Sequence, residues 1–297
     1  MIHIISGKEL WEWRKEAISA SVKVNISPSE LDWLLKEVAD LDSLSLRLES
    51  FKNKPEIKLN LPFVELKKLW HRRVGEKVPV QYLLGTTHWR NFSLKVSPAV
   101  LIPRPETEQI IDIVLAETSG GLYYQGNWAD LGTGSGALAI GLADILTKST
   151  IYAVDYSPEA LSMAKTNAEK LGFSEKIKFY QGSWFEPLAA LQGKLAGMVS
   201  NPPYIPGGMI VDLQPEVALH EPHLALAGGE DGLDCIRHLI NSAPKYLQKG
   251  GIWLIEMMTG QAETVAKLLE LQGSYKQISI IKDLAGVERF ALAYIKD

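Results

Sequence analysis

The four residues Asn201-Pro202-Pro203-Tyr204 form the most specific chemical motif in the chain. Asparagine before a proline pair with an aromatic residue after it is expected by chance in roughly a few parts per thousand. The Asn201 carboxamide oxygen and the carbonyl before Pro203 are neutral acceptors on a stiff turn, and Tyr204 supplies a flat ring. We therefore interpret Asn201, Pro202, Pro203 and Tyr204 as residues that bind a planar NH2 group of a substrate. Asn201, Pro202 and Tyr204 are the candidate catalytic residues.

The chemistry of such a site follows from the weakness of an amide or aromatic NH2 nitrogen as a nucleophile. Its lone pair is delocalised, so both N–H bonds must be held on acceptors to polarise the nitrogen and aim it at an electrophile. Positioning and electrostatics then replace a strong base. A methyl sulfonium is a suitable electrophile for this arrangement.

A second candidate site is the glycine-rich run Asp130-Leu131-Gly132-Thr133-Gly134-Ser135-Gly136, which lies between an expected strand and an expected helix. Its glycines let the backbone approach a ligand, and the exposed amides of the helix start favour an anionic group. Asp155 follows about 20 residues later, at the end of the next strand, where it could accept hydrogen bonds from ribose hydroxyls or cap the following helix.

The glycine-rich run alone leaves two cofactor classes open. Residues 134–139 also satisfy a relaxed dinucleotide fingerprint, so a nicotinamide-dependent dehydrogenase is an alternative on this motif. Hydride transfer does not need the NH2-binding turn at Asn201. That turn favours methyl transfer.

Apolar β-rich runs alternate with helical patterns in the C-terminal two thirds of the chain, which predicts an α/β fold with a mostly parallel sheet. The expected strands are Trp128–Leu131, Ile151–Asp155, Ile177–Gln181, Gly197–Ser200 and Ile252–Glu256. Two further runs, Lys276–Ile281 and Arg289–Tyr294, are joined too closely for a crossover helix and predict an antiparallel pair at one end of the sheet. The glycine turn, Asp155 and Asn201 should then meet at the carboxyl edge of the sheet, where such folds bind ligands.

The N-terminal part shows helical spacing of apolar residues and helix-capping motifs, which predicts a small helical bundle. Ser27-Pro28-Ser29-Glu30 is a firm helix start, and a second helical pattern from Phe63 should end near Arg73, with Gly75 behind it. After it, Gln81–Gly85 and Trp89–Val96 suggest extended segments around a turn, which we interpret as a β-hairpin linker.

Composition limits the class of protein and its partners. The 297 residues suit about two domains, and 46% hydrophobic residues exclude wholesale disorder. Residues 1–80 carry 14 lysines and arginines against 12 acidic residues, and residues 81–297 carry 17 against 23, so no basic stripe for nucleic acid is evident. No segment resembles a membrane span or a signal peptide, and the one cysteine and six histidines lack metal-ligand spacing. We expect a cytoplasmic protein without a metal.

The order of the glycine run, Asp155 and the Asn201 turn resembles S-adenosylmethionine-dependent methyltransferases of the seven-strand class. More closely, the chain resembles the HemK/PrmC family of protein glutamine methyltransferases, which modify the Gly-Gly-Gln glutamine of peptide chain release factors. Further stretches that match the family are Pro79–Gly85, Leu101–Glu108, Glu221–Leu226, Gly228–Leu233, and Asp283–Gly286 with Arg289. The match departs from the family pattern at Glu256–Gln261 and at Ser183, where the family often has Asp before the tryptophan.

The resemblance implies a helical substrate-docking domain (residues 1–78), a β-hairpin linker (79–102) and a Rossmann-like methyltransferase domain (103–297). It implies S-adenosyl-L-methionine as cofactor, with S-adenosyl-L-homocysteine as product, and class 1 release factors as partners. We expect a monomer, although the sequence does not reveal the oligomeric state. The cofactor-binding residues that it implies are Gly132, Thr133, Gly134, Ser135, Gly136, Asp155, Trp184 and Asn201. Trp184 is expected to flank the adenine.

Two other functions stay open on the sequence. A DNA amino-methyltransferase would present the same planar NH2 group on a flipped adenine or cytosine, although the chain lacks a basic stripe and a base-recognition domain. A catalytically silent adaptor could bind release factors through residues 1–78, although the intact Asn201–Tyr204 turn argues against it. Arg104, Glu106 and the 228–233 loop have no assigned role at this point.

Overall fold

The computed structural model describes residues 2–119 and 125–297, which divide into two compact units. The first unit runs to Gly85 and also contains Pro215–His220; the second consists of Thr86–Gln214 and Glu221–Asp297. The first unit therefore ends inside the range 79–102 that the sequence assigns to a linker. In the described residues, no helix is long and apolar enough to cross a membrane.

The first unit is a helical bundle with a short strand pair, and one of its helices comes from a distant part of the chain. Its helices are α1 (Gly7–Val22), α2 (Pro28–Val38), α3 (Ser43–Leu48), α4 (Phe63–Glu76), α5 (Val80–Leu84) and α9 (Pro215–His220), with a 3-10 turn η1 (Ser50–Asn53). Strands β1 (His3–Ile5) and β2 (Ile57–Leu59) pair antiparallel, a feature that the sequence patterns did not indicate. Buried Arg73 of α4 binds Glu30 of α2 at 2.6 Å and Glu216 of α9 at 2.8 Å, which ties α9 into the unit.

Local capping explains where the helices of this unit begin and end, and it corrects two predictions. Ser27 caps α2 as predicted, with its hydroxyl accepting from the amide of Ser29. The segment 81–85 is a helix and not a strand, because the Pro79 carbonyl accepts the amides of Tyr82 and Leu83 and Gly85 closes the turn with φ +68°. Helix α4 also continues beyond Arg73 to Glu76. A hairpin is present in this region, as strands β3 (Thr86–Trp89) and β4 (Phe92–Lys95), but its turn lies at Arg90 and Asn91, inside the segment expected to be one strand.

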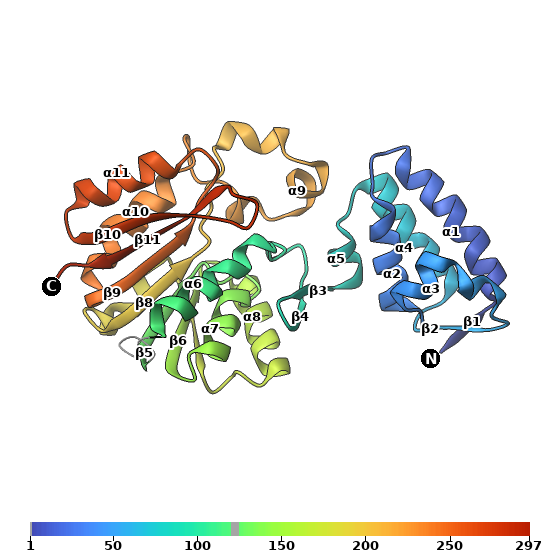
Figure 1. The fold of residues 1–297 in the computed structure, drawn as a ribbon, viewed down its shortest axis with the longest axis horizontal. Helices are drawn as coiled ribbons and strands as arrows, with labels where there is room; N and C mark the ends of the chain where they lie inside the picture. The colour runs from blue at the N-terminus through green and yellow to red at the C-terminus, as the bar shows by residue number, and fades with distance from the viewer. Residues whose placement is uncertain (1, 120–124) are drawn as a thin grey trace. The chain divides into compact units, whose positions relative to one another are not determined.

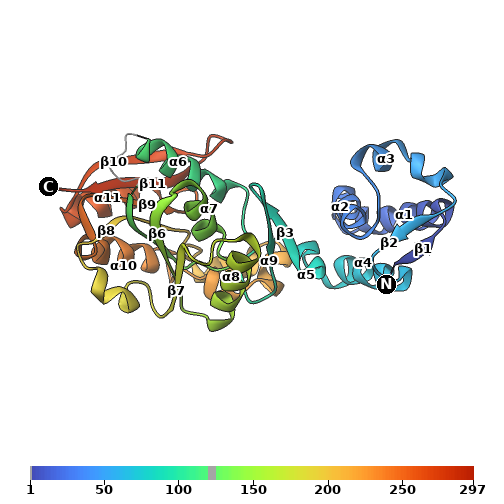
Figure 2. The ribbon, with the colours of Figure 1, turned by 90° about the horizontal axis from the view of Figure 1, so that it is seen from below.

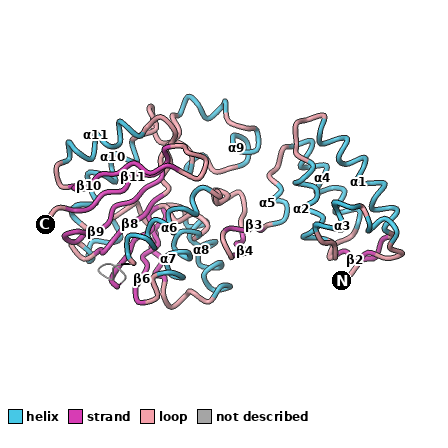
Figure 3. The backbone as a smooth tube through the Cα atoms, in the orientation of Figure 1, coloured by secondary structure: helices cyan, strands magenta, loops and turns pink. Residues whose placement is uncertain are grey.

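The second unit is built on a twisted sheet that contains every strand expected after residue 127. Within residues 125–297, seven strands lie in the order β10-β11-β9-β8-β5-β6-β7 (Figures 1 and 3). They are β5 (Gln125–Leu131), β6 (Lys148–Asp155), β7 (Ile177–Gln181), β8 (Leu195–Ser200), β9 (Leu247–Glu256), β10 (Tyr275–Lys282) and β11 (Glu288–Ile295). The five strands from β9 to β7 are parallel, and β11 pairs antiparallel with both β9 and β10. The predicted fold class is confirmed.

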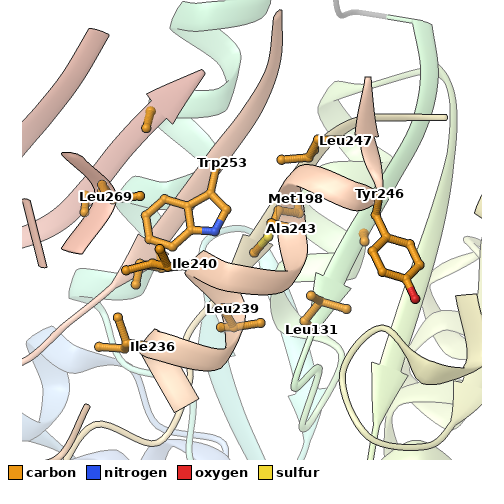
Figure 4. Packing of buried hydrophobic residues seen from close by; sticks show 14 of the residues in the cluster. Leu131, Met198, Ile236, Leu239, Ile240, Ala243, Tyr246, Leu247, Trp253 and Leu269 are labelled. Atoms are coloured by element: carbon orange, nitrogen blue, oxygen red, sulfur yellow. The ribbon is translucent and has the colours of Figure 1, made fainter. Parts of the chain in front are cut away.

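Helices cover both faces of this sheet (Figures 1 and 2). One face packs against α10 (Asp234–Ser242) and α11 (Ala262–Gln272), and the other against α6 (Gln109–Thr118), α7 (Ala137–Ile145) and α8 (Pro158–Leu171). Figure 4 shows Trp253 of β9 and Met198 of β8 among the apolar side chains of α10. Strands buried on both sides read as continuous apolar runs, which is why their positions could be predicted. Short 3-10 turns occupy the connections: η2 (Glu106–Glu108), η3 (Glu186–Leu191), η4 (Gly207–Asp212), η5 (His223–Ala225) and η6 (Ala243–Lys245).

Candidate active site

A cavity of about 550 Å³ lies in the second unit, at the carboxyl edge of the sheet. Strands β5 and β8 are neighbours there, but β5 is followed by β6 on one side of the pair and β8 by β9 on the other. Open α/β sheets bind ligands at such a switch in strand order. The volume suits a drug-sized molecule. The cavity is lined by Gly132, Thr133, Gly134 and Ser135 after β5, Asp155 and Tyr156 after β6, Ser183 and Trp184 after β7, Asn201 and Pro203 after β8, and Val100, Arg104, Thr107 and Leu224 from connecting segments, among others.

The glycine-rich turn adopts a backbone that only glycine accepts without strain. Gly132, Gly134 and Gly136 have φ values of +78°, +54° and +84°. Gly136 is outside the cavity lining, and a Cβ there would lie 3.1 Å from the Cα of Ala164 in α8. Glycine is needed at position 136 because α8 packs closely against it, and not because it lines the cavity. Gly132–Ser135 do line the cavity.

The base of the turn is held by Asp130, which is fully buried at the end of β5. One carboxylate oxygen accepts hydrogen bonds from the Thr133 hydroxyl and from the Ala139 amide at 3.0 Å. The other oxygen has no partner among the described residues. Burial raises the pKa of Asp130 to about 7. The carboxylate thus anchors both the turn and the first residues of α7.

Asp155 supports the start of α8, as the sequence suggested, and it also lies in the cavity wall, whereas its role toward a ribose stays a prediction. Its carboxylate accepts the Gly134 amide at 2.8 Å and the Ser157 amide at 2.9 Å, so it braces the glycine turn and the start of α8 at once. It also lines the cavity, so its carboxylate can accept from a ligand there. Burial raises the pKa of its carboxyl.

Trp184 lies opposite the glycine turn. Its indole would contact a Cβ at Gly132 at 3.6 Å, and it has a left-handed backbone with φ +48°. Its ring centroid is 6.5 Å from that of His238. The indole therefore forms a flat wall of the cavity. Ser183, which stands where the family often has Asp, lies beside it in the lining.

The Asn201 turn follows β8 and is tied to a polar network that the sequence patterns did not reveal. The Asn201 Nδ2 donates to Thr107 Oγ1 at 3.1 Å, and the Thr107 hydroxyl donates to Glu256 Oε2 at 2.6 Å. The Tyr204 hydroxyl donates to the other oxygen of Glu256 at 3.0 Å. Asn201 and Pro203 line the cavity; Pro202 is buried, and neither Pro202 nor Tyr204 is among its lining residues.

Glu256 is a fully buried carboxylate at the end of β9, the strand beside β8. Burial raises its pKa to about 6, although its two hydrogen bonds and the charge of Arg289 act in the opposite direction. Burial and the adjacent carboxylate also raise the pKa of Tyr204, so its hydroxyl stays protonated and donates. A polar residue at the end of a strand next to β8 is the signal that could have identified Glu256.

The 228–233 loop supports the same turn from behind. The Gly228 amide donates to the Ile205 carbonyl, and a Cβ at Gly232 would lie 2.3 Å from the Tyr204 carbonyl oxygen. The Gln261 side chain donates to the carbonyls of Tyr204 and Gly232 at 3.1 and 3.2 Å. Gly228 and Gly232 are required because the loop backbone packs directly against the backbone of the Asn201 turn.

Arg104 also has a defined place at the cavity. Its guanidinium binds buried Glu221 at 2.6 Å, and its carbonyl accepts the Trp89 indole N–H at 3.0 Å. Glu106 begins the 3-10 turn that carries Thr107. Asn167 of α8, which sequence reasoning missed, donates to the Ser135 carbonyl at 2.8 Å and bonds both backbone groups of Lys95, which joins the hairpin to the glycine turn.

Comparison with known proteins agrees with this architecture. A family model for a methyltransferase domain matches residues 125–288. A methyltransferase structure from Pyrococcus furiosus resembles the fold with a TM-score of 0.51 at 16% identity, covering 70% of this chain and 90% of that one.

Two curated relatives extend the match to the whole chain. Release factor glutamine methyltransferase of Synechocystis sp. is 50% identical over 291 residues, covering 97% of each chain. The protein of the same name from Thermosynechococcus vestitus is 45% identical over 292 residues, covering 97% of this chain and 99% of its own. The resemblance inferred from the motifs is thereby confirmed, and the chain belongs to the release factor glutamine methyltransferase family.

Proposed function

We propose that this protein transfers a methyl group from S-adenosyl-L-methionine to the side-chain amide nitrogen, N5, of the Gly-Gly-Gln glutamine in peptide chain release factors. The observation that carries the proposal is the position of Asn201 in the wall of a nucleotide-sized cavity, with its Nδ2 bound to Thr107. That bond leaves the carboxamide oxygen to accept an N–H from a substrate amide. The name shared by the full-length relatives supports the same reaction.

The residues around the cavity suit S-adenosyl-L-methionine. The amides at the start of α7 favour the carboxylate of its methionine part, Asp155 suits the ribose hydroxyls, and the Trp184 indole offers a flat face to the adenine. When bound, the cofactor supplies an electrophilic methyl group on a sulfonium. A nicotinamide dinucleotide fits the site less well, because hydride transfer gives no role to the Asn201 turn, which lines the same cavity.

The protein's part in the reaction is to hold a weak nucleophile in position. We assign Asn201 Oδ1, in the cavity wall, as the first acceptor for the glutamine NH2 group and the carbonyl of the adjacent buried Pro202 as the second. Tyr204, which is also outside the lining, holds the turn through its hydrogen bond to Glu256. The cofactor would supply the methyl group and keep the electron pair of its C–S bond, and the amide nitrogen would lose one proton to water. No strong base is needed because the amide is polarised by its two acceptors and aligned with the methyl group.

We assign recognition of the intact release factor to the helical unit, residues 1–78, because the candidate cofactor and amide-binding residues all lie beyond residue 128. Binding energy from such a remote contact can position the glutamine loop. Helix α9 follows the Asn201 turn in the sequence and belongs to the first unit, where Glu216 binds Arg73. The chain therefore connects the amide-binding turn to the helical unit.

The experiment that tests the function is incubation with labelled S-adenosyl-L-methionine and, separately, a purified release factor, DNA or RNA. We expect label in the release factor alone, with mass spectrometry placing one methyl group on the Gly-Gly-Gln glutamine. A release factor with Gly-Gly-Asn in place of Gly-Gly-Gln is the matched control and should stay unlabelled. Label in DNA with none in the release factor would overturn the proposal in favour of an amino-methyltransferase of bases.

A further inference from the structure

We propose that Thr107 and Glu256 are positioning residues that fix which end of the Asn201 carboxamide faces the substrate. The inference rests on the proposed function, since it gives a reason why Asn201 presents an acceptor to an NH2 group. It adds a requirement that the turn Asn201–Tyr204 does not contain by itself.

The argument begins with the chemical symmetry of an asparagine side chain. The carboxamide oxygen and nitrogen have almost the same shape, so packing alone does not select one orientation over its flip. In one orientation the oxygen accepts a substrate N–H. In the other, an NH2 group faces the substrate NH2 group, and two donors are opposed.

Glu256 breaks this symmetry through Thr107. An ionised carboxylate only accepts hydrogen bonds, and the Thr107 hydroxyl has a single proton, which it donates to Glu256 Oε2 at 2.6 Å. The Thr107 oxygen can then only accept, so Asn201 must turn its NH2 toward it, at 3.1 Å. The carboxamide oxygen is consequently directed away from Thr107. Both Thr107 and Asn201 line the cavity.

The surroundings of Glu256 are built to keep this carboxylate in place. It is fully buried, and its second oxygen accepts the Tyr204 hydroxyl at 3.0 Å, so one carboxylate holds both ends of the turn. The charge of Arg289 favours the ionised form, and Glu106 opposes it. Arg289 is itself held by Asp283 at 2.8 Å. Burial of a carboxylate is costly, and we infer that its acceptor character is what the site uses.

The pH dependence follows from the same chain of hydrogen bonds. Glu256 has a pKa of about 6, raised mainly by burial, and its neighbours are Thr107, Tyr204, Arg289 and Glu106. Below this pH the carboxyl is protonated and can itself donate, so the Thr107 proton is free to point at Asn201. The methyl-transfer step should therefore slow as the pH falls through about 6.

The test uses the full-length enzyme, saturating S-adenosyl-L-methionine and an intact release factor in single-turnover assays. Thr107→Val removes the hydroxyl at nearly constant volume, Thr107→Ser keeps it, and Glu256→Gln replaces the pure acceptor with a group that also donates. Thr118→Val is the matched control, because its buried hydroxyl donates to the Val114 carbonyl at 2.8 Å within α6. We expect Thr107→Val and Glu256→Gln to lose roughly 10- to 100-fold in rate, because a misoriented acceptor costs about 1.4–2.8 kcal/mol.

Three readouts separate positioning from loss of folding. The KM for the release factor and the cofactor Kd should stay within about threefold, Thr107→Ser should recover most of the rate, and Glu256→Gln should lose the acid limb of the pH profile. Equal impairment of Thr107→Val and Thr107→Ser, or a Thr107→Val rate within threefold of the parent, would overturn the inference.

A structural readout keeps this test separate from that of the proposed function. In ¹⁵N-labelled protein, the Asn201 side-chain NH2 protons should be protected from exchange in the parent and Thr107→Ser, and lose protection in Thr107→Val. An active parent with unprotected Asn201 NH2 protons would refute the orientation but not the function. A parent that shows this protection yet methylates no release factor would refute the proposed function alone.

Discussion

The replacement Asp155→Ala tests how the protein would hold the ribose of S-adenosyl-L-methionine. The carboxylate lines the cavity while accepting the amides of Gly134 and Ser157 at 2.8 and 2.9 Å. Each hydrogen bond from a ligand hydroxyl to a charged acceptor contributes about 1.5–3 kcal/mol. We therefore expect the cofactor Kd to rise roughly 10- to 150-fold.

The same change should affect folding less than it affects binding. Burial raises the pKa of Asp155, which means that burying its ionised carboxylate opposes folding. Removing it relieves that cost, which offsets the loss of partners for two backbone amides. The thermal midpoint should therefore change by only a few degrees.

Isothermal titration calorimetry with S-adenosyl-L-methionine and with its demethylated product measures the affinity, and circular dichroism measures the unfolding. Asp144→Ala is the control, because Asp144 is an exposed carboxylate of α7 outside the cavity lining. A folded Asp155→Ala variant that binds the cofactor within twofold of the parent would refute the reasoning. Tighter binding of NADH than of S-adenosyl-L-methionine by the parent would refute the cofactor assignment itself.

Three further predictions concern the turn and its supports. Asn201→Ala should lower the single-turnover methylation rate about 100- to 1,000-fold, because a placed polar group stabilises the transition state by roughly 2.7–4 kcal/mol; a loss below threefold would contradict its role. Gly232→Ala places a Cβ 2.3 Å from the Tyr204 carbonyl oxygen and should cut turnover at least about tenfold, whereas the control Gly260→Ala, which also has a positive φ but no atom within 4 Å, should not. For Asp130, whose pKa is raised to about 7, the neutral form stabilises the fold fully below pH 3.8, and this contribution is lost as the pH rises through 7. The free energy of unfolding in urea should decline less between pH 5 and 8 for Asp130→Asn than for the parent. An equal decline in both proteins would count against the raised pKa of Asp130.

The sequence by itself determined the parts of this protein that depend on local pattern. Buried parallel strands read as apolar runs, so each strand beyond residue 127 could be predicted. Capping residues predicted the start of α2, and the glycine-rich run predicted a turn that leads into α7. The rule that parallel strands end at one edge then brought Gly132–Ser135, Asp155 and Asn201 together.

Only the tertiary structure decided how those residues are held. Thr107 and Glu256 are 149 positions apart, and no local pattern can report that Thr107 donates to Glu256 while it accepts from Asn201. The helix over Val80–Leu84 was missed because five residues are too short for a hydrophobic period. Gly136 illustrates the same limit, since its neighbour Ala164 belongs to another helix. Contacts between distant segments fix the donors and acceptors of the site, and they exist only once the sheet has formed.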